Sequence, residues 1–386
     1  MFLALADRNF AAAGPGNYLQ RPAEWYAGPE AAEIGRRVLS HQAPLGGWPK
    51  NLDTTAQINT APVEQLAPTF DNRATTDELR LLARLYNATK DDKYRTAFER
   101  GLQYILKAQY PTGGWPQSYP IRPTTYHRHI TFNDDAMVRV LEFLREISDP
   151  DQMNGDRYDF LTPDERAQAK RAFDRGIECI LKCQIHVNGK LTAWCAQHDE
   201  LDYRPRKGRW HELPSISGAE SISIVRLLMS IEKPSPAVIA AVEGAVAWFR
   251  TAEIKGYRIV QHPEDKTPGK FREAVADPTA PTLWARMVDI ETNQPLVSGM
   301  DSVPHLGMQE IGFGRPGYAW FGPWATPLLE KEYPAWNKHV ESSSSRDSAE
   351  GIRRDTARLT AGTDLRQRID QTQFGHGNHP GSDRCG

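Results

Sequence analysis

Acidic and amide side chains gather at three places in the chain, each directly ahead of an apolar helical stretch. These segments are 70–72 (Phe-Asp-Asn), 132–135 (Phe-Asn-Asp-Asp) and 217–221 (Ser-Gly-Ala-Glu-Ser). One side chain is enough to cap a helix, so the segments carry more oxygen donors than capping requires. If the helices close into a ring, the three helix starts meet on one face. Such oxygen ligands suit a hard cation such as Ca²⁺, and we expect metal-assisted or acid/base chemistry on a polar substrate there.

A basic loop precedes the third acidic segment. It contains Arg204, Arg206, Lys207 and Arg209, and it leads into Pro214. Guanidinium groups match carboxylates in geometry, so this loop could bind a polyanionic sugar. Taken alone, the same loop would equally suit a solvated surface segment.

Two kinds of helix alternate along the chain. Residues 97–109 (AFERGLQYILKAQ) match residues 172–184 (AFDRGIECILKCQ), and fainter copies lie at 32–42 and 241–253. Helices of a second type are predicted between them, at 75–86, 137–147 and 222–231, because their apolar residues recur at helical spacing. Gly-Gly-Trp-Pro follows the first two copies, at 46–49 and 113–116.

The repeat length indicates the architecture. The two Gly-Gly-Trp-Pro turns are 67 residues apart (113 − 46), and the terminal glutamines Gln109 and Gln184 are 75 apart. A unit of this length, with two helices and long loops, predicts a mainly α protein, an (α/α)₃ toroid built of repeated helical hairpins. Short strands are expected in the loops, at 189–194 and 257–260.

Composition narrows the possible partners. The chain has 386 residues and a formal net charge of −2, so it has no basic field to attract nucleic acid. No apolar stretch approaches the about 18 residues of a membrane span. Cys179 and Cys183 lie four apart on one helical face and are expected to be buried thiols, and the absence of a CxxC pair argues against a thiolate zinc site.

Three segments are expected along the chain. Residues 1–30 are predicted to be an N-terminal extension, and they lack a clear signal peptide. Residues 31–338 are predicted to form one catalytic toroid domain. Residues 339–386 are polar and rich in glycine near their end, which predicts a disordered tail.

Several motifs resemble the pectate lyases of polysaccharide lyase family 10. The resemblance spans about residues 30 to 335 and rests on eight segments: GGWPK at 46–50, TFDNRATT at 69–76, GGWPQ at 113–117, ITFNDDA at 130–136, TAWCAQH at 192–198, PSISGAES at 214–221, WAR at 284–286 and YAWF at 318–321. It implies an (α/α)₃ toroid and calcium-dependent β-elimination of polygalacturonate, an acidic plant cell-wall polysaccharide. It also implies a secreted or periplasmic enzyme, and we expect a monomer without nucleic-acid or membrane partners.

The resemblance also implies roles for individual residues. Arg209 is the expected base that takes the C5 proton of the sugar. The expected metal or acid contacts are Asp71, Asp134 and Asp135. The expected substrate-binding residues are Lys50, Asn72, Asn133, Glu220 and Arg286.

The chain departs from the family pattern at two places. The family often has Ala-Arg-Ala-Tyr-Glu where this chain has Gly208-Arg-Trp-His-Glu212, and Met300 stands where the family tends to have arginine. An arginine base is chemically demanding because arginine is almost always protonated. Lys50, Lys207 and His211 are therefore alternative bases.

Two other functions fit the same residues. An inverting glycoside hydrolase would use two carboxylates about 6.5–9.5 Å apart, drawn from Asp71, Asp134 and Glu220. A non-catalytic toroid would bind an acidic glycan without turnover.

Overall fold

The computed structural model describes residues 14–149, 158–265, 267 and 269–342. The chain divides into two compact units, Met1–Leu328 and Leu329–Gly386. Every candidate site residue belongs to the first unit. Within the second unit, residues 333–342 are helical, and the remainder of the predicted tail, 343–386, lies outside the described residues. The predicted domain boundaries at 30 and 338 stay predictions.

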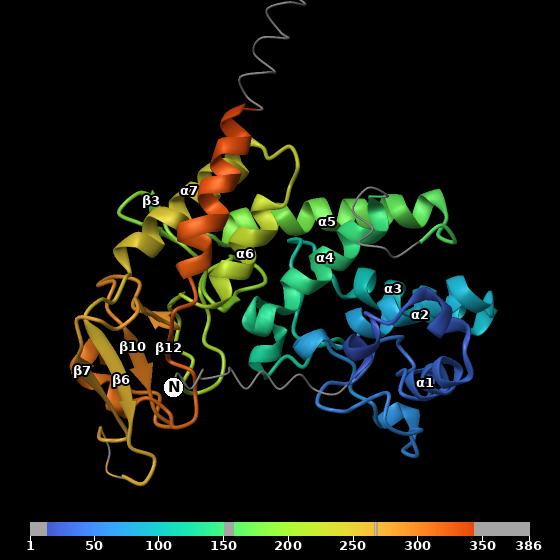
Figure 1. Ribbon diagram of the computed structural model, residues 1–386, viewed down its shortest axis with the longest axis horizontal. Coiled ribbons are helices and arrows are strands. Elements are labelled where there is room, and N and C mark those ends of the chain that lie inside the picture. Colours follow the sequence, from blue (N-terminus) through green and yellow to red (C-terminus); the bar gives the residue numbers. More distant parts are fainter. Residues whose placement is uncertain (1–13, 150–157, 266, 268, 343–386) are drawn as a thin grey trace, which may run out of the picture. The chain divides into compact units, whose positions relative to one another are not determined.

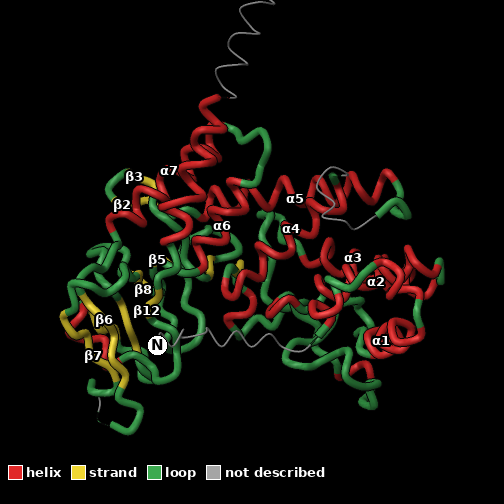
Figure 2. The backbone as a smooth tube through the Cα atoms, in the orientation of Figure 1, coloured by secondary structure: helices red, strands yellow, loops and turns green. Residues whose placement is uncertain are grey.

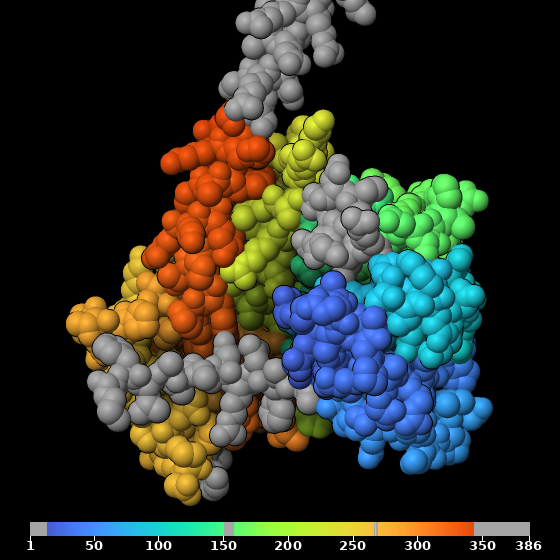
Figure 3. All heavy atoms as spheres, turned by 45° about the vertical axis from the view of Figure 1, so that its right-hand side comes forward, coloured from blue at the N-terminus to red at the C-terminus, as the bar shows by residue number. Residues whose placement is uncertain are grey.

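The first unit is mainly α-helical, and the predicted (α/α)₃ toroid is confirmed. Its described α-helices are α1 (Pro29–Ser40), α2 (Thr76–Thr89), α3 (Asp92–Ala108), α4 (Ala136–Ser148), α5 (Pro163–Cys183), α6 (Glu220–Met229) and α7 (Pro236–Thr251) (Figure 1). Helices α2, α4 and α6 contact one another in one row, and α1, α3, α5 and α7 form the second row. The part of the chain from α1 to α3, coloured blue to cyan, forms one continuous surface in Figure 3.

The two rows differ in how much of each helix is buried. Helix α4 packs against α2, α5 and α6, and its residues Val138, Leu141, Phe143 and Leu144 are all buried. Helix α5 has one polar face, and it begins with a capping box between Thr162 and Glu165. Burial of apolar surface between the rows is thus the main force that holds the repeats together.

Equivalent glutamines join each repeat to the next. Gln109 and Gln184 stand directly after α3 and α5, and Gln42 stands two residues after the last residue of α1. Each Nε2 donates 2.8 Å hydrogen bonds to a carbonyl of its own following loop and to a carbonyl of the next second-row helix. The acceptors on those next helices are Ala97, Ala172 and Ala241. The repeated glutamine of the sequence is therefore a connector between repeats.

Four tryptophans also repeat. The indole Nε1 of Trp48, Trp115, Trp194 and Trp284 donates at 2.8–2.9 Å to a carbonyl of the preceding second-row helix. All four indoles are buried. In the first two copies the turn needs glycine: Gly46 and Gly113 have φ of 107° and 96°, and an added Cβ would lie 2.2 Å from a carbonyl oxygen of the neighbouring helix.

Short antiparallel strand pairs bind the loops together (Figure 2). The pairs are β1 (Ile130–Thr131) with β4 (Gln197–His198), β2 (His186–Val187) with β3 (Lys190–Leu191), β5 (Ile216–Ser217) with β9 (Met287–Val288), β6 (Tyr257–Gln261) with β7 (Arg272–Ala276), β8 (Trp284–Ala285) with β12 (Phe321–Gly322), and β10 (Leu296–Ser298) with β11 (Pro304–Leu306). The strands expected near 189–194 and at 257–260 are confirmed as β3 and β6.

Two further predictions concern the cysteines and membrane-spanning helices. Cys179 and Cys183 are free buried thiols with sulfur atoms 4.0 Å apart, as predicted. No helix in the described part of the chain has both the length and the apolar character needed to cross a membrane.

Candidate active site

Each acidic helix start hydrogen-bonds to the loop of the next repeat. The backbone N–H of Phe70 donates to Gln117, that of Phe132 to Ala196 and that of Gly218 to Arg286, at 2.8–3.0 Å. The pairs β1–β4 and β5–β9 continue two of these contacts. The starts therefore line up in one place, and the predicted convergence has a backbone cause.

The acidic residues do not act as helix caps. Segments Asp71–Arg73 and Asn133–Asp135 are single 3₁₀ turns that precede α2 and α4, and the N-cap side chains of α2 and α4 make no capping hydrogen bond. Asn72, Asp134 and Asp135 have φ of 51–61°, in the left-handed region. Such a conformation is uncommon outside glycine, and it marks a turn in the backbone at each of these positions.

Asp71 is buried and holds two partners. Its Oδ2 accepts a hydrogen bond of 2.5 Å from Gln117 Nε2 and forms an ion pair with Lys50. Its Oδ1 is buried and has no hydrogen-bond partner. A buried acceptor without a partner is unfavourable, so this oxygen is available to a cation or a substrate donor.

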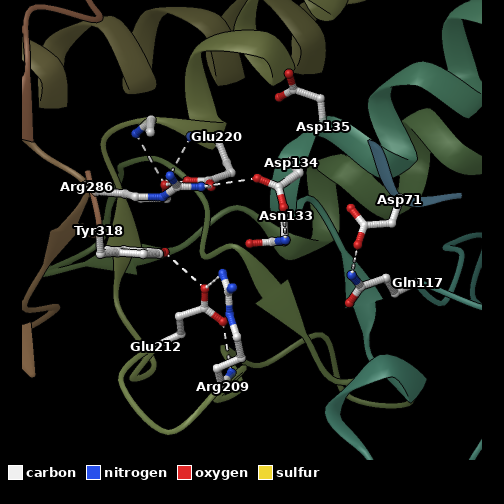
Figure 4. A network of polar contacts seen from close by, with 12 residues as sticks. Asp71, Gln117, Asn133, Asp134, Asp135, Arg209, Glu212, Glu220, Arg286 and Tyr318 are labelled. Atoms are coloured by element: carbon white, nitrogen blue, oxygen red, sulfur yellow. Dashed lines mark hydrogen bonds and ion pairs between the residues drawn. The ribbon is translucent and has the colours of Figure 1, made fainter. Parts of the chain in front are cut away.

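Arg286 connects two of the acidic starts (Figure 4). Its Nη2 forms an ion pair with Glu220 and lies 3.5 Å from Asp134 Oδ1. Asn133 Nδ2 donates to the other oxygen of Asp134 at 2.7 Å. Burial and the negative charge of Glu220 raise the pKa of Asp134, against the opposing effect of Arg286. A bound cation would relieve this crowding of negative charge.

Asp135 lies apart from that group. Its carboxylate points away from Asp134 in Figure 4 and pairs with Arg139 at 3.3 Å. Both aspartates nevertheless line one cavity of about 600 Å³, together with Lys50 and Asn72. The structure therefore gathers Lys50, Asn72, Asp134 and Asp135 around one space.

Arg209 stands beside Arg286 across one aromatic ring. The guanidinium carbons of Arg209 and Arg286 lie 5.7 and 5.0 Å from the ring centre of Tyr318. Glu212 accepts hydrogen bonds from the Arg209 side chain and, at 3.0 Å, from the Tyr318 hydroxyl. Sequence reasoning assigned no role to Glu212 or Tyr318, although both lie in segments that it singled out.

The alternative bases occupy different environments. His211 is fully buried, and burial together with the nearby arginines lowers its pKa to about 4, so it is neutral near pH 7. Lys207 donates to Ser302 at 2.7 Å in an exposed position, and Lys50 is held by Asp71. His211 packs edge to face against the Tyr318 ring, with ring centres 4.8 Å apart. Among the described contacts, neither Lys50 nor Lys207 lies against that ring.

A preformed metal cage is not found at the predicted acids. Among the described residues, the group of three metal-type side chains whose ligand atoms lie within 4.8 Å is His129, Asp199 and Glu200, elsewhere in the chain. Those carboxylates already have partners, because Glu200 pairs with Arg128 and Asp199 pairs with Arg206. Asp71, Asp134 and Asp135 would need ligands from a substrate to complete a cation site.

Gln117 is a further site residue that the sequence could have revealed. It occupies the position after Gly-Gly-Trp-Pro in the second repeat, where Lys50 stands in the first. Both side chains bind the same oxygen of Asp71. Met300, which stands where the family tends to have arginine, is 63% exposed.

Comparisons with known proteins identify the family and the fold. The profile of the family described as pectic acid lyase matches residues 42–329. The chain is similar to a solved structure of a family 10 polysaccharide lyase from Cellvibrio cellulosa, with 31% identity, a TM-score of 0.66 and coverage of 82% of this chain and 94% of that one. It is also similar to an alanine mutant of a family 10 polysaccharide lyase from Cellvibrio cellulosa in complex with trigalaturonic acid, with 32% identity, the same TM-score and coverage of 82% and 95%. No curated protein sequence matches it.

Proposed function

Because the chain belongs to the pectic acid lyase family and is a polysaccharide lyase, we propose that it cleaves polygalacturonate by calcium-dependent β-elimination with Arg209 as the base. The observation that carries the proposal is the contact of one nitrogen, Arg286 Nη2, with both Asp134 and Glu220. In this arrangement the two carboxylates can bind a cation, and the guanidinium beside them can bind the carboxylate of a uronate. The similar lyase solved with trigalaturonic acid supports an acidic sugar as the ligand.

The donor set fits Ca²⁺. Asp134 and Glu220 supply carboxylate oxygens, and the unpartnered Oδ1 of Asp71 is a third candidate. Calcium prefers six to eight oxygen ligands, so a few protein acids would make a weak site that the substrate carboxylate completes. When bound, calcium would withdraw electron density from the uronate carboxylate and so make the C5 proton more acidic.

The side chains have separate tasks in this mechanism. Arg286 orients the uronate carboxylate by a charge-assisted hydrogen bond. Arg209, in its neutral guanidine form, takes the C5 proton on a side-chain nitrogen and becomes guanidinium, the electron pair of that C–H bond forms the C4–C5 double bond, and the C4–O4 bond breaks. The departing O4 takes a proton from water. The products are a chain whose new non-reducing end carries a 4,5 double bond and a chain with a new reducing end, because the departing oxygen stays on C1 of that chain.

Glu212 keeps Arg209 in place and charged before substrate binds. Burial alone would lower the pKa of Arg209, but the hydrogen bond and charge of Glu212 outweigh burial and raise it well above its ordinary value. A cation in the site would disfavour that charge. Arg209 therefore acts as a base only in the loaded site, and the rate should rise with pH.

An inverting hydrolase mechanism that uses Asp134 and Glu220 fits this geometry less well. Asp134 and Glu220 touch the same nitrogen, so their nearest oxygens lie within about 6 Å of each other. An inverting glycosidase needs about 6.5–9.5 Å between its two carboxyl groups.

We also propose that the enzyme acts outside the cytoplasm, where polymeric pectate is found, and that it is a monomer.

The proposal is tested by following absorbance on polygalacturonate with added calcium and with a chelator. A new near-ultraviolet absorbance that the chelator abolishes is expected, because the unsaturated end conjugates with the carboxylate. New reducing ends without that absorbance would identify a hydrolase. Binding of the polymer without either signal would identify a binding protein.

A further inference from the structure

The cavity beside Asp134 extends past the residues that the mechanism uses. Its lining includes Lys50, Asn72 and Asp134. It also includes Arg73, Asp77, Glu78 and Arg139, together with residues 14–17. Its volume of about 600 Å³ lies within the range of about 300–1,000 Å³ that is usual for ligand sites. The space therefore continues from the reactive cluster toward a second polar group.

Glu78 offers an unused polar atom in that second group. It is 3% exposed, its Oε1 accepts a hydrogen bond from Thr54 at 3.1 Å, and its buried Oε2 has no partner. Burial, with the nearby charge of Asp77, raises the pKa of Glu78 to about 8, so its carboxyl group holds a proton near pH 7. A buried carboxylic acid without a partner can donate a hydrogen bond to a sugar hydroxyl.

Two arginines face the same space. Arg73 is 59% exposed, and its guanidinium lies 3.9 Å from Asp77. Asp77 also pairs with the nearly buried Arg80 at 3.4 Å, which supplies its counter-charge and leaves Arg73 weakly held. Arg139 pairs with Asp135 at 3.3 Å through one Nη, and its buried Nε has no partner. Two neighbouring guanidiniums with spare donors favour an anion between them.

A second metal ion does not explain this group. Asp77, Glu78 and Asp135 are not among the sets of three ligand atoms within 4.8 Å in the described part of the chain. The segment at residues 14–17 closes the space on one side, since an added Cβ on Gly16 would lie 2.7 Å from Asp77 Oδ2. The backbone of residues 14–17 therefore packs closely against Asp77.

We propose that Arg73, Arg139 and Glu78 form a binding subsite for a further uronate unit of the polysaccharide, beyond the units that occupy the reactive cluster. The two guanidiniums hold the carboxylate of that unit, and Glu78 donates to one of its hydroxyl groups. The inference rests on the proposed function for its ligand. It predicts that the enzyme favours long, unesterified chains over a trimer.

The test compares substrates of different length. Arg73→Gln removes a guanidinium that is 59% exposed, and Arg36→Gln, which removes an arginine that is 63% exposed on α1 and is not among the cavity residues, is the matched control. We expect the ratio of kcat/KM on polygalacturonate to that on trigalacturonate to fall about tenfold in Arg73→Gln, the loss of about one charge-assisted hydrogen bond, and to stay within twofold in the control. Glu78→Leu should lower the ratio similarly, and Glu78→Gln, which keeps a donor, should lower it less.

An unchanged ratio in Arg73→Gln, or an equal loss on trimer and polymer, would overturn the subsite. Binding of hexagalacturonate by calorimetry separates this failure from a failure of the proposed function, because it needs no turnover. If the wild-type protein does not cleave the polymer, a Kd for the hexamer that is about tenfold weaker in Arg73→Gln still supports the subsite. An unchanged Kd contradicts it.

Discussion

The carboxylate of Glu212 binds Arg209 at two points. Its Oε2 accepts from the Arg209 backbone N–H at 2.8 Å, and its Oε1 accepts from the guanidinium. The three-residue spacing of the two positions allows both contacts within one turn of the loop. Arg209 is thereby fixed in direction as well as in charge, so Glu212 is expected to control when Arg209 can lose a proton.

Replacement of Glu212 should move the pH profile. The carboxylate raises the pKa of Arg209, so Glu212→Gln lowers that pKa and shifts the rise of kcat/KM to lower pH. The amide keeps an acceptor for Tyr318. The measurement is kcat/KM on polygalacturonate with saturating calcium from pH 7 to 11. Glu232→Gln, on an exposed position, is the control. A profile identical to that of the wild-type protein would show that Glu212 does not set the proton affinity of the base.

Loss of a proposed calcium ligand should weaken calcium binding and leave the base, Arg209, in place. Asp134→Asn and Glu220→Gln are each expected to raise the calcium concentration for half-maximal rate at least about tenfold, since one charged ligand is lost. Arg209→Lys provides the contrast, because it should lower kcat and leave the calcium half-saturation within about threefold. The readout is initial rate against calcium concentration. Equal calcium dependence in all variants would remove Asp134 and Glu220 from the metal site.

The repeats could be predicted from the sequence because the same positions recur in each copy. The helices and their order follow from two patterns. One is the periodic apolar residues of 75–86 and 137–147, and the other is the pair of matched segments that end at Gln109 and Gln184. The positions of Asp71 and Asp134 on one face follow from that order.

The direction of each site side chain could not be predicted. Asp135 follows Asp134 in sequence, yet the left-handed turn sends the two carboxylates apart, toward Arg139 and Arg286. The pairing of Gly218 with Arg286 joins residues 68 positions apart (286 − 218) and depends on how the loops pack. Local sequence patterns carry no information on such contacts.

The connecting glutamines should contribute to stability. Gln184→Leu removes two 2.8 Å hydrogen bonds and leaves the carbonyls of Thr192 and Ala241 without this donor in a buried setting. We expect the free energy of unfolding to fall by about 2–4 kcal/mol. Urea denaturation measures it. Gln168→Leu, at an exposed position of the adjoining helix α5, should change it by less than about 0.5 kcal/mol. Equal effects of the two substitutions would mean that Gln184 does not hold the repeats together.

Glu78 should make stability depend on pH. Its pKa of about 8 in the folded protein lies above the ordinary pKa of 4.5. The favourable contribution of its neutral form is fully present below pH 4.5 and is lost as pH rises through 8, because the unfolded chain releases the proton first. Glu78→Gln removes this loss, so its Tm relative to wild type should increase from pH 5 to pH 8. The slope removed is at most about 1.4 kcal/mol per pH unit. A Tm difference that is constant over this range would show that Glu78 is ionised in the folded protein.

The assignment of Arg209 as the base is tested most directly by Arg209→Ala. Calorimetry of trigalacturonate binding with calcium and kcat on polygalacturonate should be measured on the same preparation. The account predicts that kcat falls by about 10²–10⁴-fold, the usual contribution of a general base, while the Kd for the trimer changes less than about tenfold. A kcat within tenfold of the wild-type value, with binding intact, would contradict the assignment of Arg209 as the group that removes the C5 proton.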